Sequence, residues 1–221
     1  MSSNAVSNNQ EKIMKLTVFG ATGSIGRHLI SQALESGHQV TAFSRQPQSL
    51  TIKHPNLTLF TGDVTNLSSV TKAIEGADCV LITLGSAGLT SKVRSVGTAN
   101  IVQAMQQLQV KRLICQTTLG VGDSSANLNF FWKYIMFGLI LRFVFKDHVL
   151  QETIVKRSNL DWIIVRPAAF IDEELNETYR SGFPVSEKNL TLSISRKHVA
   201  DFMLRQLSDN TFLKQTPGLS Y

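Results

Sequence analysis

Cysteine is scarce in this sequence, and it follows no disulfide or metal-binding pattern. The 221 residues contain two cysteines, Cys79 and Cys115, without a Cys-x-x-Cys pair or a histidine cluster beside them. This spacing argues against a disulfide framework and against a zinc site, and it fits a reducing, cytoplasmic compartment. Residues 1–12 are polar and lack the apolar stretch of a signal peptide, which predicts a flexible tail over residues 1–13.

Long uncharged hydrophobic runs are also missing. The most apolar stretch, residues 130–145, is interrupted by Lys133 and Arg142, with only eight residues between them. A membrane-spanning helix needs about 20 apolar residues, so we do not expect this aromatic segment to cross a membrane. We expect a helix that covers a pocket or rests on a partner, and its pattern continues, with a break, through residues 148–157.

Charge of one sign is not gathered anywhere in the chain. The net charge is +6, but the lysines and arginines are scattered, and no basic stripe for nucleic acid is evident. We therefore expect no nucleic-acid partner. The excess of positive charge fits an anionic ligand, such as a cofactor that carries phosphate groups.

Apolar runs alternate with helical patterns along the chain. This order is typical of a parallel sheet with helices on both faces. We predict an α/β fold, a Rossmann-type doubly wound parallel sheet in a single domain over residues 14–221, with a substrate-covering segment over residues 120–190. The expected strands are 15–19, 38–43, 57–60, 79–84, 112–116 and 162–165, and the expected helices are 24–36, 67–75, 93–108 and 197–207. Residues 170–190 look irregular, and a short tail follows the last helix.

Three glycines spaced by two residues follow the first apolar run. Gly20, Gly23 and Gly26 come directly after residues 16–19 and open a helical pattern. In a dinucleotide site, the first glycine permits a tight turn, the second lets the backbone approach the phosphates, and the third lets the helix pack closely. The helix N-terminus supplies free N–H groups and a positive dipole end. We therefore predict a dinucleotide pyrophosphate site with contacts from Gly20, Thr22, Gly23, Ser24 and Ile25.

The end of the second expected strand carries no acidic residue. NAD-binding domains place an Asp or Glu about 20 residues after the glycines, where it accepts a hydrogen bond from the ribose 2′-hydroxyl. Here no Asp or Glu lies between Glu35 and Asp63, and the strand leads into Ser44 and Arg45. A guanidinium can hold a 2′-phosphate and stack on adenine, so NADP(H) is favoured over NAD(H). The alternative is that Arg45 is a solvated loop residue.

Further cofactor contacts are expected where the third and fourth strands end. Asp63 and Val64 follow the third strand, where a carboxylate and backbone groups can bind the adenine amine. The alternative for Asp63 is a cap on the next helix. Leu84 and Gly85 end the fourth strand, and a glycine there lets the backbone run beneath the cofactor ribose.

Two hydroxyls and a histidine are candidates for the reacting end of the site. Thr117 and Thr118 end the fifth strand, and open α/β sheets bind ligands at the carboxyl ends of their strands. We expect the Thr118 hydroxyl to face the nicotinamide and a substrate carbonyl or imine; the alternative is a turn residue that bonds its own backbone. Asp147 could orient His148 or raise its pKa, although a lone helical histidine is more often structural or solvated.

Several motifs together indicate a family. The glycine pattern, with Gly62-Asp63-Val64, resembles the atypical short-chain dehydrogenase/reductases. The Tyr-x-x-x-Lys pair of the main branch is absent, because Gly138 stands four residues after Tyr134 and Phe183 four residues after Tyr179. Four further motifs are similar to the biliverdin reductase B/flavin reductase group, namely Thr117-Thr118, Asp147-His148, Val165-Arg166-Pro167 and Ser195-Arg196-Lys197-His198-Val199.

This resemblance implies an activity and several residue roles. Members of the group reduce flavins and linear tetrapyrroles with NADPH, as monomers. The resemblance places a catalytic hydroxyl at Thr118, a catalytic histidine at His148, and cofactor contacts at Thr117 and Pro167. Ala169 stands where the group has a second active-site histidine, which leaves the identity of the substrate open.

The sequence therefore predicts a monomeric NADPH-dependent reductase that transfers hydride to a flat conjugated acceptor, such as FMN, another flavin or biliverdin. Apolar residues of the aromatic segment would cover the acceptor, and no metal is expected. Two alternatives stay open. One is a non-catalytic NADP-sensing regulator of the NmrA-like type. The other is a complex-assembly or membrane-associated factor that docks through the aromatic segment.

Overall fold

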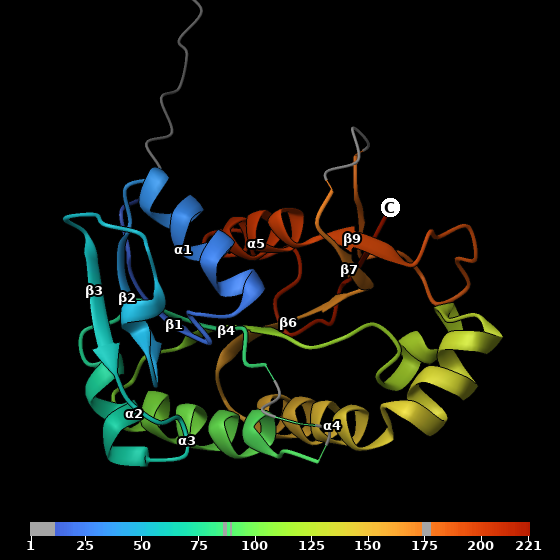
Figure 1. Cartoon of the computed structure of the whole chain (residues 1–221), viewed down its shortest axis with the longest axis horizontal. Coiled ribbons are helices and arrows are strands. Elements are labelled where there is room, and N and C mark those ends of the chain that lie inside the picture. The colour runs from blue at the N-terminus through green and yellow to red at the C-terminus, as the bar shows by residue number, and fades with distance from the viewer. Residues whose placement is uncertain (1–11, 86–87, 89, 174–177) are drawn as a thin grey trace, which may run out of the picture.

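A computed structural model describes residues 12–85, 88, 90–173 and 178–221, so nearly all of the expected tail over residues 1–13 lies outside the described residues. Eight strands form a central sheet in the order β3-β2-β1-β4-β5-β6-β10-β8, and β7 pairs with β9 (Figure 1). The strands are β1 (Lys15–Phe19), β2 (Gln39–Ser44), β3 (Leu57–Thr61), β4 (Cys79–Ile82), β5 (Arg112–Gln116), β6 (Asp161–Pro167), β7 (Ala169–Ile171), β8 (Arg180–Ser181), β9 (Ser193–Ser195) and β10 (Gly218–Ser220).

Helices cover both faces of the sheet. One face carries α1 (Ser24–Glu35) and α5 (Arg196–Arg205), and the other carries α2 (Leu67–Ile74), α3 (Val93–Gln107) and α4 (Arg142–Arg157) (Figure 1). Short 3₁₀ helices span Pro47–Ser49 (η1) and Gly122–Asn127 (η2). Successive residues of a strand point to opposite faces. Leu16 and Val18 of β1 therefore join the hydrophobic cluster under α1 and α5, whereas Phe19 joins the cluster on the other face.

The strand order reverses between β1 and β4. From β1 the chain continues to β2 and β3 on one side, while β4, β5 and β6 extend the sheet on the other. All neighbouring pairs among these six strands are parallel. The predicted Rossmann-type doubly wound fold is thereby confirmed. In such sheets ligands bind outside the carboxyl ends of the strands at the point of reversal.

The C-terminal tail is a strand, contrary to expectation. Gly218–Ser220 forms β10, which runs parallel to β6 and antiparallel to β8, and the Leu219 side chain is fully buried. Short strands β7 and β8 also lie in the region expected to be irregular. Segments of two or three residues are too short to show the alternation that marks a strand in a sequence.

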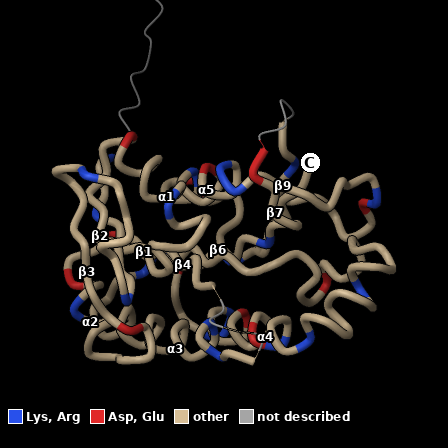
Figure 2. Tube along the Cα trace, in the orientation of Figure 1, with Lys and Arg blue, Asp and Glu red and all other residues tan. Residues whose placement is uncertain are grey.

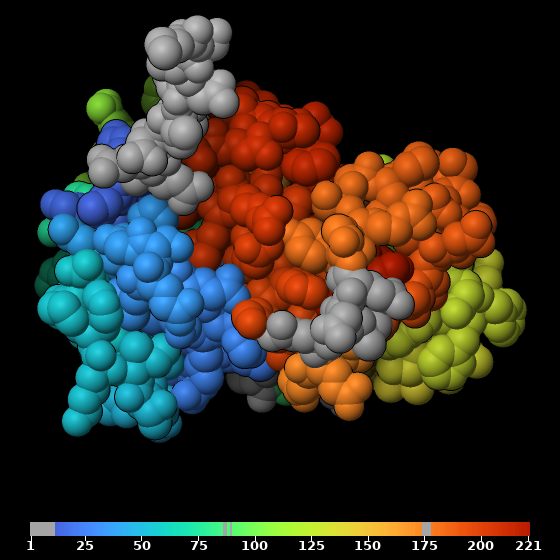
Figure 3. Space-filling model, turned by 90° about the horizontal axis from the view of Figure 1, so that it is seen from above, coloured from blue at the N-terminus to red at the C-terminus, as the bar shows by residue number. Residues whose placement is uncertain are grey.

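The aromatic segment is helical as expected, but its geometry is unusual. Phe131–Ile140 (η3) forms a π-helix, and α4 begins at Arg142. None of the ten η3 residues is buried, and Leu139 is 69% exposed, so the outer side of η3 faces solvent. Figure 3 shows this yellow segment at the opposite end of the molecule from the blue N-terminal part. No helix among the described residues is both long and apolar enough to cross a bilayer.

Charged residues are dispersed over the molecule. Figure 2 shows Lys and Arg interspersed with Asp and Glu along the helices and connections. Within the described parts of the chain, no group of three or more His, Cys, Asp or Glu side chains is placed to hold a metal ion. Because open α/β sheets bind ligands at the carboxyl ends of their strands, we expect the candidate site among the cavities at that edge.

Candidate functional site

The glycine turn joins β1 to α1 at the point where the strand order reverses. Gly20 has a φ of +88°, and a Cβ there would stand 2.3 Å from the Thr83 carbonyl oxygen. A Cβ on Gly26 would stand 2.2 Å from the Gly20 carbonyl oxygen, so the helix packs on the turn only because this residue is glycine. Gly23 is the N-cap residue before α1, and no side chain caps this end of the helix. The first N–H groups of α1 are thus free to bind an anion.

A cavity of about 280 Å³ lies against this turn, and we name it the glycine-turn cavity. It is built where β1, β2, β3 and β4 end. Nine of the predicted cofactor residues line it, namely Gly20, Thr22, Gly23, Ser44, Arg45, Asp63, Val64, Leu84 and Gly85. Ser24 is exposed beside it, whereas the Ile25 side chain is buried in the core, which leaves its backbone as the group available to a ligand. The individual contacts of these residues stay predictions.

The polar side chains of this cavity include hydroxyls, a guanidinium and a carboxylate. The hydroxyl oxygens of Thr22 and Ser44 lie 3.0 Å apart, and the neighbouring Arg45 side chain is exposed at the rim. Asp63 accepts hydrogen bonds from the backbone N–H and hydroxyl of Thr65, and these bonds hold the pKa of Asp63 below its usual range. Asn66, not Asp63, caps α2, so the capping alternative for Asp63 is wrong.

A second cavity, of about 320 Å³, lies at the ends of β5 and β6, and we name it the aromatic cavity. Three groups of side chains line it: Thr118 and Pro167 from the strand ends, Trp132, Phe137 and Leu141 from the aromatic segment, and His148, Arg94 and Arg196 from the helices. Both cavities reach the start of α3, where Val93 lines the glycine-turn cavity and the next residue, Arg94, lines the aromatic cavity. Thr117 and Pro167, predicted as cofactor contacts, lie in the aromatic cavity.

Thr118 stands where the sequence places it, at the end of β5. Its hydroxyl is half-buried and lies 3.4 Å from the Leu119 carbonyl oxygen, a long contact with its own turn. A hydrogen bond at this distance is weak. The geometry leaves the hydroxyl able to bond a ligand in the aromatic cavity.

His148 is buried and neutral, and Asp147 does not orient it. Burial, together with the positive charge of Arg94, lowers the pKa of His148 to about 3. The Asp147 carboxylate instead accepts hydrogen bonds from the N–H groups of Arg94 and Ser95 and from the Ser95 hydroxyl, so it holds the first turn of α3. The expectation that Asp147 orients His148 or raises its pKa is therefore wrong, because a carboxylate prefers the free N–H groups of a helix N-terminus.

The lowered pKa of His148 predicts an acid sensitivity of folding. The unfolded state, with a histidine pKa of about 6.5, binds the proton more readily than the native state, so stability falls as the pH drops from about 6.5. We expect His148→Gln to flatten the decline of the unfolding free energy between about pH 6.5 and pH 4. Urea denaturation at several pH values measures this, with His28→Gln, at an exposed histidine of α1, as the control. An unchanged slope would show that His148 is not buried as described.

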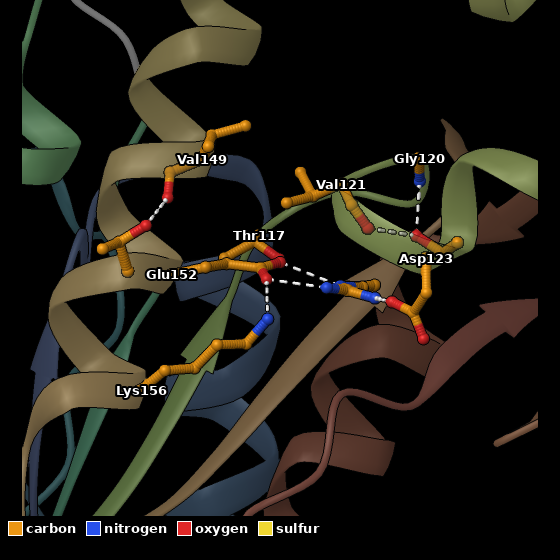
Figure 4. A network of polar contacts seen from close by, with 10 residues as sticks. Thr117, Gly120, Val121, Asp123, Val149, Glu152 and Lys156 are labelled. Atoms are coloured by element: carbon orange, nitrogen blue, oxygen red, sulfur yellow. Dashed lines mark hydrogen bonds and ion pairs between the residues drawn. The ribbon is translucent and has the colours of Figure 1, made fainter.

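A buried ionic network fixes the ends of β5 and β6 (Figure 4). Arg166 is 1% exposed and donates through Nε and Nη2 to the two carboxylate oxygens of Glu152, at 2.9 and 2.7 Å. Glu152 also accepts from the Thr117 hydroxyl and from Lys156, and Asp123 accepts from Arg166 at 2.6 Å. The Thr117 hydroxyl is thus directed into this network. Sequence reasoning missed Glu152, because only the four-residue spacing to Lys156 is visible in a sequence.

A larger cavity, of about 930 Å³, lies elsewhere. It is lined by the last turn of α1, by α5, and by His38, which precedes β2. His38 marks the amino ends of the strands, the edge opposite to the glycine turn. Ligands of open α/β sheets bind at the carboxyl edge, so the two smaller cavities form the candidate site.

The fold, the glycine turn and the paired cavities define a Rossmann-type dinucleotide-binding domain. A family model described as NAD(P)H-binding matches residues 20–210. The chain belongs to this NAD(P)H-binding family.

Some curated relatives match about half of the chain, and another matches nearly all of it. A 3-beta-hydroxysteroid dehydrogenase of Mycolicibacterium neoaurum is 35% identical over 113 residues, which is 45% of this chain and 31% of that protein. The chain therefore spans about a third of the length of this relative. The UPF0659 protein YMR090W of Saccharomyces cerevisiae is 27% identical over 226 residues, covering 93% of this chain and 92% of that protein.

Solved structures share the fold over nearly the whole chain. A short-chain dehydrogenase/reductase of Veillonella parvula, determined in complex with NADP, has a TM-score of 0.80 at 20% identity and covers 95% of each chain. The anaerobilin reductase ChuY of Escherichia coli O157:H7 has a TM-score of 0.76 at 23% identity and covers 93% of this chain and 96% of that one. At this level of identity the likeness shows the fold.

Proposed function

We propose that the protein is an NADPH-dependent reductase that transfers hydride to a flat conjugated acceptor held in the aromatic cavity. The observation that carries the proposal is the presence of two cavities at the carboxyl ends of the strands, both of which reach the start of α3. One is built around a glycine turn with free helix N–H groups, and the other is an apolar pocket that begins one residue further along α3. A bound NADPH supplies the hydride, and the protein contributes position and electrostatics.

The choice of NADP(H) over NAD(H) is supported by the rim of the glycine-turn cavity. Ser44 is the last residue of β2, and the next residue, Arg45, is exposed at the rim. NAD-binding domains carry an acidic residue at this position. The guanidinium can bind a 2′-phosphate that NAD(H) lacks. The Veillonella parvula neighbour was determined in complex with NADP, the cofactor proposed for this protein.

The acceptor is proposed to be flat and conjugated because of the walls of the aromatic cavity. Trp132, Phe137 and Leu141 come from the inner side of the aromatic segment and present apolar surface opposite the ends of β5 and β6. Flavins and linear tetrapyrroles fit such walls, and the ChuY neighbour is an anaerobilin reductase. His148, with a pKa of about 3, stays neutral and positions the acceptor, so the proton that completes the reduction comes from solvent.

Removal of the Thr118 hydroxyl should lower turnover more than cofactor affinity. The hydroxyl lies in the aromatic cavity at the end of β5, where it can hold the acceptor against the nicotinamide. Hydride transfer needs near-contact geometry, so a small misplacement costs up to about 100-fold in rate. We expect Thr118→Val to turn over slowly and Thr118→Ser to resemble the unmodified protein, with little change in the NADPH dissociation constant. Full activity of Thr118→Val would assign the hydroxyl to its own turn.

Steady-state oxidation of NADPH with a panel of acceptors tests the proposal as a whole. FMN, riboflavin, biliverdin and a quinone are offered in turn, and loss of the nicotinamide absorbance is followed. We expect at least one flavin or tetrapyrrole to be reduced. If NADPH binds and no acceptor is turned over, the non-catalytic NADP-sensing alternative replaces the reductase.

A further inference from the structure

Two arginines enter the aromatic cavity, although its walls are otherwise mostly apolar. Arg94, in the first turn of α3, and Arg196, the first residue of α5, both line the cavity. They come from helices on opposite faces of the sheet, and both line the cavity at the ends of β5 and β6. The sequence predicts an apolar cover over the acceptor, and that cover includes neither arginine.

Both guanidinium groups have buried nitrogen atoms without hydrogen-bond partners. In Arg94 these are Nε and Nη1, and in Arg196 it is Nε. The Asp147 carboxylate beside Arg94 is occupied by the N–H groups of α3 and by Ser95, so it bonds the backbone of Arg94 and not its guanidinium. Burial lowers the pKa of Arg94, against the attraction of Asp147. Burying a charged N–H donor without an acceptor costs folding free energy. We therefore expect a ligand to supply the missing acceptor.

The Arg196 guanidinium has a hydrogen-bond partner at the surface, whereas its Nε is buried without one. Its Nη1 donates to Asp172 at 2.6 Å, and the Asp172 side chain is 89% exposed, so this ion pair lies at the surface. The guanidinium also lies over the Phe170 ring, 5.4 Å from its centroid. The ion pair and the ring hold the side chain in place, while Nε faces inward.

We infer that Arg94 and Arg196 bind an anionic group of the acceptor, a phosphate or a carboxylate, so that the aromatic cavity selects flat acceptors that carry negative charge over neutral ones. The inference rests on the proposed reductase function and names the substrate class of the same site. Guanidinium groups bind carboxylates and phosphates through paired N–H donors, and the apolar walls strengthen these bonds by excluding water. A neutral apolar substrate, such as a steroid, would leave the buried nitrogen atoms of both guanidinium groups without hydrogen-bond partners.

Equilibrium binding of a matched pair of flavins tests the inference without turnover. FMN and riboflavin share one ring system and differ in a phosphate. Binding is followed by flavin fluorescence, with the protein saturated with NADP⁺. We expect FMN to bind roughly 100-fold more tightly than riboflavin, about tenfold for the charged hydrogen bond from each of the two arginines. Biliverdin and its dimethyl ester form a second matched pair for the same measurement.

Variants assign the preference to the two arginines. Arg94→Gln and Arg196→Gln should each reduce the ratio of FMN to riboflavin affinity by about tenfold, because each removes a charged donor. Arg157→Gln, at an exposed arginine in the last turn of α4, is the matched control and should leave the ratio unchanged. The NADP⁺ affinity is measured for every variant to show that the folded cofactor site is retained.

Each outcome decides one of the two proposals. Equal binding of the charged and neutral members of both pairs, or no binding of any of the four, overturns the inference. The inference is also overturned if Arg157→Gln lowers the ratio of FMN to riboflavin affinity as much as Arg94→Gln and Arg196→Gln do. If charged acceptors bind selectively but NADPH reduces none of them, the inference stands and the reductase function fails.

Discussion

We expect replacement of Glu152 with alanine to lower the free energy of unfolding by about 3–5 kcal/mol, the usual cost of leaving a buried charge without its partner. Glu152 is 2% exposed and binds Arg166 through both oxygens, and Arg166 is itself 1% exposed. Asp123 alone cannot compensate, because its side chain is 68% exposed and contacts only one nitrogen of Arg166. Urea denaturation of the variant measures the loss.

A matched control separates burial from charge in this network. Lys156 also bonds Glu152, but its side chain is 40% exposed. We expect Lys156→Gln to cost less than about 1 kcal/mol, as surface ion pairs do. If Glu152→Ala is as stable as Lys156→Gln, the network does not hold the ends of β5 and β6.

The same pair has a defined dependence on pH. Burial alone would raise the pKa of Glu152, but the hydrogen bonds and charges of Arg166 and Lys156 outweigh it and lower the pKa. The folded-state pKa therefore lies below the unfolded value of about 4.3. The stability from this pair is present above that pH and is lost as the pH falls through the folded-state pKa.

The second large effect is expected in cofactor choice. Arg45→Ala should weaken NADPH binding by about 1.5–3 kcal/mol, or roughly 10- to 150-fold, because it removes a hydrogen bond to a charged phosphate. NADH lacks this phosphate, so its affinity should change little. Titration of protein or nicotinamide fluorescence measures both constants. Equal losses for the two cofactors would contradict the assignment of Arg45, and Arg157→Ala, at an exposed residue of α4, is the control.

Local patterns were sufficient to predict the six parallel strands β1 to β6 and the glycine-turn cavity. β1, β2 and the glycines between them are close in sequence. Their apolar runs and glycine spacing predict a strand, a tight turn, a helix and a second strand in that order. The residues that end β3 and β4 could be placed in the same cavity because parallel strands end at one edge. Nine of the eleven cofactor residues predicted between Gly20 and Gly85 therefore line one cavity.

The remaining features depend on contacts between distant residues. Asp147 was assigned to its sequence neighbour, His148, but its partner is the start of α3, 52 or 53 residues earlier. Arg94 lies in a helix with no motif, and it reaches the aromatic cavity only because α3 and α4 pack side by side. β10 is defined by pairing with β6, not by its own three residues. No pattern within one element could show these arrangements.

Anaerobic single-turnover mixing tests the central claim most directly. The protein with one equivalent of bound NADPH is mixed with an excess of FMN, and the nicotinamide and oxidised-flavin absorbances are followed together. The account predicts that both fall with the same rate constant and in equal amounts, and that the rate constant drops in Thr118→Val. Stable nicotinamide absorbance with FMN bound, and likewise with biliverdin bound, would contradict a reductase and leave a protein that binds NADPH without using it.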